Sequence, residues 1–512
     1  MTESRYAVAA VVALATFVTA GVHIAHAEVR PERIAWHECR TGPEDEYGAQ
    51  LDAAGVRCGE VTVPLDYTRP AGRTITVAVA RRTATDPVRR VGTLVVNTGG
   101  PGESLSGVTW LVQGMPPWVP GGAPQVAARF DLVAIDPRFH GRSTPLECGW
   151  PTATAQSAAW VGPDRRSFEV SVARNRDLAS RCAGQAALLP YASTRNVARD
   201  LDAVRAALGE PAVSFVGWSW GSYLGAVYAQ LFPGRVDRLV LDSAVNPDTY
   251  GPDASGADWP AQMAEQRNWA RWAAGHDDRY HLGGTTAQAL ASLDVIRRAA
   301  DRGRTLRVGR HRLDPNAIRR IVLGTDTEQM YAQWGHLMRL FYDAARGVPV
   351  TPTAEQDAMF DWVSSTEVAA GASAFAASLC ADRAARSRDP EVYYRDIQAH
   401  RAAEPMYGPA NRNVTSCTFW PTEPAEPPTT IGTTVPALIV GATGDPTTPY
   451  AGQLVMRRAM AGARLVTLRG AYRHGVYLFD GDACVDGAVN RYLLDGALPP
   501  ADITCARTSP KP

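Results

Sequence analysis

Several common features are nearly or wholly missing from this 512-residue chain. Lysine occurs once, as Lys511, and the 52 basic and 52 acidic residues leave no net charge. A chain without excess positive charge gives no electrostatic case for nucleic acid or an anionic membrane as a partner. Beyond the N-terminal segment no apolar run is long enough to span a bilayer, so we expect no stable membrane association.

The N-terminal residues have the pattern of an export signal. Arg5 precedes an apolar, alanine-rich stretch over 6–22, and Ala25-His26-Ala27 provides an A-x-A cleavage site. We therefore expect a signal peptide over residues 1–27, cleaved after Ala27, and a secreted mature chain that begins at Glu28. A retained membrane anchor is the alternative, but the apolar stretch is short and ends in histidines.

The eight cysteines are an even, widely spaced set without the C-x-x-C pair of zinc and redox sites. Such a set fits disulfides in an exported protein, with buried free thiols as the alternative. The sequence does not fix the connectivity, and pairing in order along the chain is the simplest proposal. The last pair is the best founded, because Cys484 begins the terminal helix and Cys505 follows the Pro499-Pro500 break. The proposed pairs are Cys39 with Cys58, Cys148 with Cys182, Cys380 with Cys417, and Cys484 with Cys505.

A G-x-S-x-G sequence, Gly217-Trp218-Ser219-Trp220-Gly221, is the most informative motif of the chain. It follows an apolar run over 213–216 and precedes a helix-like segment over 222–232. A strand, a tight turn and a helix in this order place the serine Oγ above the carboxyl edge of a sheet. The pentapeptide alone occurs by chance in loops, but its flanks predict that Ser219 is a nucleophile.

A serine hydroxyl needs a general base and an orienting acid, which follow the nucleophile as acid and then histidine in folds of this type. Of the six histidines after Ser219, only His474 follows a strand-loop unit near the C-terminus. Asp445 comes just after a buried-strand pattern over 435–441, and His474 follows the next apolar run, 464–468. We therefore predict a triad of Ser219, Asp445 and His474. The alternatives are an aspartate that caps a turn and a histidine on a surface loop.

The oxyanion that forms when a serine attacks an acyl carbon needs two preorganised N–H donors. One is expected from Trp220, directly after the nucleophile. The other is expected from Gly100, with Gly99 as the second choice, because a strand pattern over 92–96 opens into a glycine-rich loop over 97–102. This loop lacks the G-K-[ST] ending of a phosphate-binding loop.

These motifs resemble those of the secreted tripeptidyl and prolyl aminopeptidase branch of the α/β-hydrolases. The resemblance covers most of residues 58–505 and rests on the GGPG loop at 99–102, the D-x-R-x-x-G-x-S run at 136–143, the turn at Ser219, the D-P-x-T-P run at 445–449, and His474-Gly475. It implies serine-dependent release of a short unit from the free N-terminus of a peptide. Glu103 and Arg473 depart from the family's usual pattern of small residues, and both are expected to border the pocket and to affect substrate choice.

The order of the strand and helix patterns predicts an α/β fold, the α/β-hydrolase fold, with a large helical cap insertion. Strand signals stop near Pro247 and resume at Val435, and the interval is helix-rich with six tryptophans. The mature chain is also too long for one plain core. We expect an N-terminal part of the core at 28–246, a helical cap at 247–434 and a C-terminal part of the core at 435–512.

An aminopeptidase must also bind a free α-amine, and a buried ammonium group needs a carboxylate partner. Asp382 resembles a C-x-D element of the family's cap, and Glu103 lies next to the expected oxyanion loop. Both are candidates for substrate binding, and a structural or surface role is the alternative for each.

No cofactor and no metal are expected. The stretch from His276 to His281 lacks a third ligand or an H-E-x-x-H helix, and the aspartates at 480, 482 and 486 lack the calcium-loop pattern. Three functions stay open: an exopeptidase; an amidase or deacylase that removes an acyl group from a secreted metabolite such as an acetylated antibiotic precursor, or an esterase; and a non-catalytic binding protein. The complete set of motifs favours an enzyme that acts on a peptide or a small amide.

Overall fold

The structure is a computed structural model, and it describes residues 33–115, 119–120, 122–151, 162, 164–302, 304–313, 318, 327–363, 365–404 and 407–507. The predicted signal peptide, 1–27, lies outside the described residues. No helix among the described residues is both long enough and apolar enough to cross a membrane.

A nine-stranded sheet forms the centre of the fold. The first two strands form an antiparallel hairpin, the second strand pairs antiparallel with β6, and all later neighbours are parallel. This confirms the predicted α/β class with a mostly parallel sheet. The strand order is β1 (Arg57–Pro64), β2 (Thr74–Arg82), β6 (Phe130–Ile135), β3 (Gly92–Asn97), β7 (Val213–Trp218), β8 (Val236–Asp242), β11 (Ala437–Ala442), β12 (Ala463–Arg469) and β13 (Ile503–Ala506).

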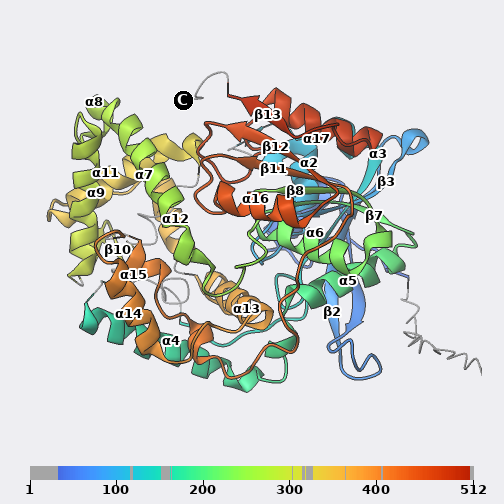
Figure 1. The fold of residues 1–512 in the computed structure, drawn as a ribbon, viewed down its shortest axis with the longest axis horizontal. Helices are drawn as coiled ribbons and strands as arrows, with labels where there is room; N and C mark the ends of the chain where they lie inside the picture. The colour runs from blue at the N-terminus through green and yellow to red at the C-terminus, as the bar shows by residue number, and fades with distance from the viewer. Residues whose placement is uncertain are drawn as a thin grey trace, which may run out of the picture. The chain divides into compact units, whose positions relative to one another are not determined.

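Helices cover both faces of the sheet (Figure 1). Successive strand residues point to opposite faces, so Phe215 of β7 joins one hydrophobic core while Val216 joins the other. Because helices cover both faces of the sheet, β7 and β11 are buried along their whole length. One face carries α2 (Gly107–Gln113), α3 (Pro124–Arg129) and α17 (Ala483–Asp495); the other carries α5 (Thr194–Ala207), α6 (Trp220–Leu231) and α16 (Tyr450–Ala459).

The chain between β8 and β11 is helix-rich in its described parts, as predicted, and lies to the left of the sheet in Figure 1. It has a hydrophobic core of its own that includes Trp269, Ile296, Met338 and Phe341. Its longer helices are α7 (Trp259–Ala274), α9 (Thr286–Asp301), α11 (Tyr331–Ala345), α12 (Ala354–Val363), α13 (Thr366–Asp382) and α14 (Pro390–His400), with short helices α8 (Asp277–Tyr280) and α15 (Gly408–Asn411) and the hairpin of β9 (Leu306–Val308) and β10 (His311–Leu313). We call this region the cap.

One helix from the predicted N-terminal part of the core packs with the cap. Phe168 of α4 (Arg165–Arg181) shares a small core with Tyr393, Ile397 and Val414. On the surface, Arg165 forms an ion pair with Glu391 of α14 at 2.5 Å. The cap is therefore built from two separate stretches of sequence.

All four disulfides pair in order along the chain, which confirms the proposed connectivity. Cys380–Cys417 joins the end of α13 to the 3-10 helix η7 (Ser416–Phe419), and Cys484–Cys505 joins α17 to the edge strand β13. The described residues contain no free cysteine.

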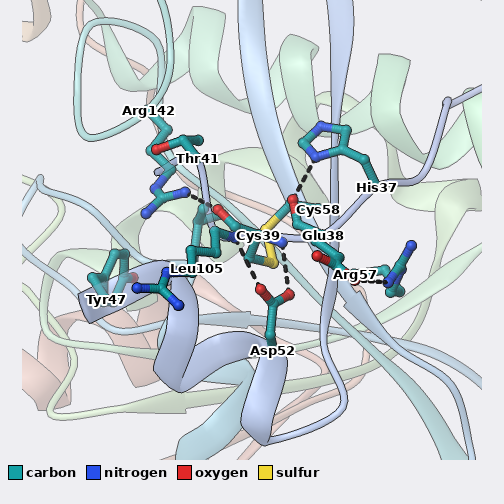
Figure 2. Close-up of a disulfide and its surroundings, with 12 residues drawn as sticks. His37, Glu38, Cys39, Thr41, Tyr47, Asp52, Arg57, Cys58, Leu105 and Arg142 are labelled. Atoms are coloured by element: carbon teal, nitrogen blue, oxygen red, sulfur yellow. Dashed lines mark hydrogen bonds and ion pairs between the residues drawn. A yellow bond between two sulfur atoms is a disulfide. The ribbon is translucent and has the colours of Figure 1, made fainter. Parts of the chain in front are cut away.

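The disulfide Cys39–Cys58 joins the N-terminal segment to β1, and Arg142, from the segment that follows β6, lies beside it (Figure 2). Asp52, on α1 (Glu46–Ala53), accepts a hydrogen bond of 2.7 Å from the N–H of Cys39. Arg142 donates to the carbonyl of Cys39 and forms an ion pair of 2.7 Å with Asp45. The N-terminal segment therefore holds Arg142 in place.

Candidate active site

Ser219 occupies a strained turn between β7 and α6, as the G-x-S-x-G motif predicts. Its backbone has φ 56° and ψ −124°, a conformation rare for residues other than glycine. A Cβ on Gly217 would lie 2.4 Å from the carbonyl oxygen of Gly221, and a Cβ on Gly221 would lie 2.6 Å from Oδ1 of Asn97. The turn therefore requires both glycines, and it leaves Ser219 partly exposed at the carboxyl end of β7.

The glycine-rich loop after β3 lies against this turn because Asn97 of β3 pairs with Gly217 of β7. Gly99 has φ +103°, and a Cβ there would lie 3.1 Å from the Cβ of Ser219. Trp220 begins α6, so its N–H has no acceptor within the helix. Among the described residues, neither that N–H nor the N–H of Gly100 donates a hydrogen bond. The N–H groups of the two predicted oxyanion donors are thus available, and Gly99, directly before Gly100, lies against Ser219.

Asp445 and His474 follow adjacent parallel strands, β11 and β12, and the structure brings them together. Nδ1 of His474 lies 3.1 and 3.0 Å from the two carboxylate oxygens of Asp445. The carboxylate is fully buried and also accepts hydrogen bonds from the N–H groups of Thr447 and Thr448 and from the amide of Gln453. These donors fix the carboxylate, which in turn orients the histidine ring with Nε2 as its remaining proton acceptor.

A corner at the end of β8, made of Asp242 and Ser243, links the nucleophile turn to the histidine loop. The carbonyl of Asp242 accepts from the N–H of Ser219 at 3.0 Å. Its carboxylate accepts from the N–H groups of Val476 and Tyr477, while Oγ of Ser243 accepts from the N–H of Gly475 at 2.8 Å. Burial raises the pKa of Asp242 to about 6, against the opposing effect of these hydrogen bonds. Sequence reasoning missed this corner, although an aspartate at the end of an apolar run was a usable signal.

Asp382, proposed from the sequence as a ligand for a substrate amine, is buried and bound to the protein itself. Its carboxylate accepts from the N–H of Thr194 at 2.7 Å and from the hydroxyl of Thr194 at 2.6 Å. Burial raises its pKa to about 7. Both donors belong to the protein itself, so the surroundings of Asp382 favour a structural role. A large cavity next to the predicted oxyanion loop is lined by Pro101 and Gly102 but not by Asp382, Ser219 or His474.

Glu103 lies where the sequence places it, directly after the oxyanion loop and exposed on the wall of that cavity. Arg473 does not. It is 2% exposed, forms an ion pair with Asp480 at 3.3 Å and donates to the carbonyl of Gly475. The expectation that Arg473 borders the pocket is wrong, because its side chain has a buried acidic partner within the histidine loop.

The cavity has a volume of about 940 Å³ and begins at Pro101, one residue beyond the oxyanion glycine. Small and aromatic residues of α13 form one wall, from Ala370 to Phe375, and Trp150 lies on another. His140 also lines it. Burial lowers the pKa of His140 to about 4, so its imidazole is neutral, and its Nε2 lies 3.1 Å from the hydroxyl of Ser378.

A second cap carboxylate was missed by sequence reasoning. Asp258, directly before α7, forms no side-chain hydrogen bond to the start of that helix. Burial raises its pKa to about 7, and the negative charge of Asp445 adds to the rise, so Asp258 is within electrostatic reach of the predicted acid of the triad. An aspartate before Trp259-Pro260 looks like an ordinary helix cap, which is why the sequence gave no reason to select it.

Among the described residues, one group has ligand atoms close enough to hold a metal ion, namely Asp482, Cys484 and Cys505. The two cysteines form a disulfide, and Asp482 accepts hydrogen bonds from the N–H groups of Cys484 and Val485. Asp482 therefore caps α17.

Comparison with known proteins gives matches along most of the chain. The sequence profile of the family described as TAP-like protein matches residues 404–505. The tripeptidyl aminopeptidase of Streptomyces coelicolor is 32% identical over 472 residues, covering 89% of this chain and 84% of that protein. Serine protease Hip1 of Mycobacterium tuberculosis is 30% identical over 491 residues, covering 92% and 91%. Carboxylesterase B of the same species is 30% identical over 505 residues, covering 93% and 91%. The solved proline iminopeptidase of Mycobacterium smegmatis is 16% identical with a TM-score of 0.36, covering 85% of this chain and 98% of that one.

Proposed function

This chain belongs to the tripeptidyl aminopeptidase-like family of α/β-hydrolases, and from that premise we propose that it is a serine aminopeptidase that releases short units from free peptide N-termini. The observation that carries the proposal is the row of groups at the carboxyl ends of adjacent strands. The oxyanion loop follows β3, Ser219 follows β7, Asp445 follows β11 and His474 follows β12. Such a row supplies a nucleophile, a base, an orienting acid and oxyanion donors at one sheet edge.

In the proposed reaction, Oγ of Ser219 attacks the carbonyl carbon of the scissile amide while Nε2 of His474 accepts the hydroxyl proton. Asp445 accepts the hydrogen bond from Nδ1–H and stabilises the imidazolium. The N–H groups of Gly100 and Trp220 stabilise the oxyanion. His474 then donates its proton to the leaving amine, which leaves an ester between Ser219 and the N-terminal unit. A water molecule, deprotonated by His474, cleaves that ester and restores the free serine.

The cavity supports a short N-terminal unit as the acyl part of the substrate. Its volume of about 940 Å³ is at the upper end of the range for small-ligand sites, roughly 300–1,000 Å³. Two acidic residues, Glu103 and Glu147, lie on its wall with one arginine, Arg142. A wall with this charge favours a cationic ammonium group over an anionic acyl group.

The direct test compares peptide amides that carry a free N-terminal amine with their N-acetylated counterparts. An aminopeptidase should cleave the free-amine series faster, whereas faster cleavage of the acetylated series would overturn the proposal.

The second candidate function is a deacylase or esterase that uses the same residues. The 30% identity to a protein named carboxylesterase B is the observation in its favour. Such an enzyme needs no amine ligand, so preference for N-acylated compounds or simple esters over free-amine peptides would select it.

We also propose that the protein is secreted after cleavage behind Ala27. Four disulfides support an oxidising destination. Mass analysis of the protein from the culture medium should find Glu28 as the first residue, and recovery of the chain from membranes with Met1 intact would contradict this. Expected partners are limited to a peptide or small amide substrate, without nucleic acid.

A further inference from the structure

A chain of three hydrogen bonds runs from the cap to the residue that follows the nucleophile. Asp382 is the last residue of α13, two positions after Cys380 of a disulfide. Its carboxylate binds both the N–H and the hydroxyl of Thr194, the first residue of α5. Oγ1 of Thr194 in turn accepts from Nε1–H of Trp220 at 2.9 Å. Residues 188 positions apart in the sequence are thus joined behind the nucleophile.

The direction of this chain is fixed by the chemistry of its members. The indole N–H of Trp220 can only donate, so the oxygen of Thr194 must accept. The single hydroxyl proton of Thr194 is then available for Asp382, whose carboxylate, when it is ionised above about pH 7, can only accept. Arg383 and Arg195 favour the ionised form of this carboxylate, whereas burial opposes it, and Tyr223 and Tyr250 lie within its electrostatic reach.

Because its members are buried, this chain of hydrogen bonds is sensitive to the loss of any one of them. Asp382 is 7% exposed, and Thr194 and Trp220 are each 1% exposed. A donor or acceptor that loses its partner in such surroundings cannot be compensated by water. The indole of Trp220 would then lose its hydrogen bond to Thr194, and the peptide that follows Ser219 would lose an anchor.

We propose that Asp382 is a positioning residue for the oxyanion hole: through Thr194 it fixes Trp220, whose backbone N–H faces the developing charge. The cap is thereby coupled to transition-state stabilisation and not only to substrate access. This inference rests on the proposed function, because it takes Ser219 as the nucleophile and Trp220 as an oxyanion donor. It assigns Asp382 a role different from binding a substrate amine.

The test uses Asp382→Asn and Thr194→Val in the full chain. Removing one oxyanion donor outright costs roughly 10²–10³ in kcat, so a donor that is only misplaced should cost on the order of tenfold. We expect that fall in kcat with KM changed less than about twofold, and we expect it equally on a free-amine peptide amide and on a simple activated ester. A loss confined to free-amine substrates would overturn the proposal and identify Asp382 as an amine ligand.

Thr194→Ser separates positioning from general damage, because serine keeps the hydroxyl that valine lacks. It should restore kcat to near the wild-type value. Asp164→Asn is the matched control: Asp164 also accepts from one N–H and one hydroxyl, those of Ser167, but at the start of α4. Asp164→Asn should leave kcat unchanged.

A double-mutant cycle with Trp220→Phe provides the decisive readout, since phenylalanine keeps the backbone N–H and removes the indole N–H. If Asp382 acts through Trp220, Asp382→Asn should cost little in the Trp220→Phe background. Losses that simply multiply would overturn the proposal. Failure of the proposed function is distinguishable, because Ser219→Ala would then retain turnover whatever happens at Asp382.

Discussion

At the scale of single residues, Ser219 is the group on which the proposed chemistry depends. Ser219→Ala should lower kcat by several orders of magnitude, because it removes the hydroxyl that forms the acyl-enzyme in the proposed reaction. Alanine removes only Oγ, and we expect the fold to survive with an almost unchanged melting temperature. Turnover of a peptide amide and labelling by a serine-directed phosphonate measure the effect. Labelling that persists in the variant would show that the nucleophile is another residue.

Asp258 gives a second prediction, because an acid with a raised pKa destabilises the folded state when it ionises. The folded protein holds this proton up to about pH 7, whereas the unfolded chain releases it at lower pH. The contribution of Asp258 to the free energy of unfolding therefore falls as the pH rises toward 7. Above pH 7 the folded state carries the full destabilisation by the buried charge. Asp258→Asn should be more stable than the wild type by on the order of 2 kcal/mol at about pH 8 and nearly equal at about pH 4. Denaturant unfolding at the two pH values checks this.

The same variant tests whether the carboxylate serves the substrate. If ionised Asp258 pairs with the ammonium group, Asp258→Asn should raise KM for free-amine peptides and hardly alter an activated ester. Asp389→Asn, at the exposed start of α14, controls for the loss of an aspartate next to a cap helix. A gain in stability that is the same at both pH values would contradict the explanation by burial.

How far single residues could be predicted from the sequence depends on how local their signal is. Ser219, Asp445 and His474 each follow an apolar run, and the end of a strand is visible in the sequence. The bond between Asp382 and Thr194 joins residues 188 positions apart, and no local pattern indicates that α13 ends against the start of α5. The expectation for Arg473 was wrong for the same reason, since its partner Asp480 is recognisable only once the histidine loop has folded.

At the scale of elements, the loop after β3 is shaped by its closeness to the nucleophile turn. Gly99→Ala would place a Cβ 2.9 Å from the carbonyl oxygen of Trp218 and 3.1 Å from the Cβ of Ser219, at a φ of +103°. The loop must move, and both the serine and the oxyanion donor beside it would move with it. We expect kcat/KM to fall by roughly 10² or more, the cost of one lost oxyanion donor.

Gly184→Ala is the control for this change, because no atom lies within 4 Å of a Cβ at that position. It should leave kcat/KM and the melting temperature close to the wild-type values. A Gly99→Ala variant with normal kcat/KM would show that this loop does not form the oxyanion hole.

Element boundaries were easier to predict than element partners. The helix-like segment over 222–232 is α6, Trp220–Leu231, and the strand patterns over 92–96 and 464–468 are β3, Gly92–Asn97, and β12, Ala463–Arg469. By contrast, the membership of α4 in the cap could not be inferred. Its partners Tyr393, Ile397 and Val414 lie more than 200 residues later, and an amphipathic helix does not reveal which surface will cover its apolar side.

At the scale of the whole molecule, the long insertion determines what the hydrolase core can bind. The core supplies the row of reactive groups, while α13 and η7 of the cap complete the cavity with Ala370, Phe375 and Cys417. The same α13 ends in Asp382, which binds the start of α5. One helix, α13, therefore contributes to both the cavity shape and the oxyanion geometry, and a change in its position against the core should affect both.

Two disulfides with loops of similar length allow this dependence to be tested. Cys380–Cys417 and Cys484–Cys505 span 37 and 21 residues, so replacing either pair by serines should lower the free energy of unfolding by a similar amount, roughly 3–4 kcal/mol in the chain-entropy description.

The effects of the two replacements on catalysis should differ. Loss of Cys380–Cys417 loosens the end of α13, which carries both a cavity wall and Asp382. We therefore expect a lower kcat and a higher KM at temperatures well below the melting temperature. Loss of Cys484–Cys505 loosens β13 at the far edge of the sheet, and the kinetics of that variant should stay near those of the wild type. Unfolding curves and steady-state kinetics of the two variants at about 25 °C decide the matter, and equal kinetic losses would show that seating of the cap does not control the site.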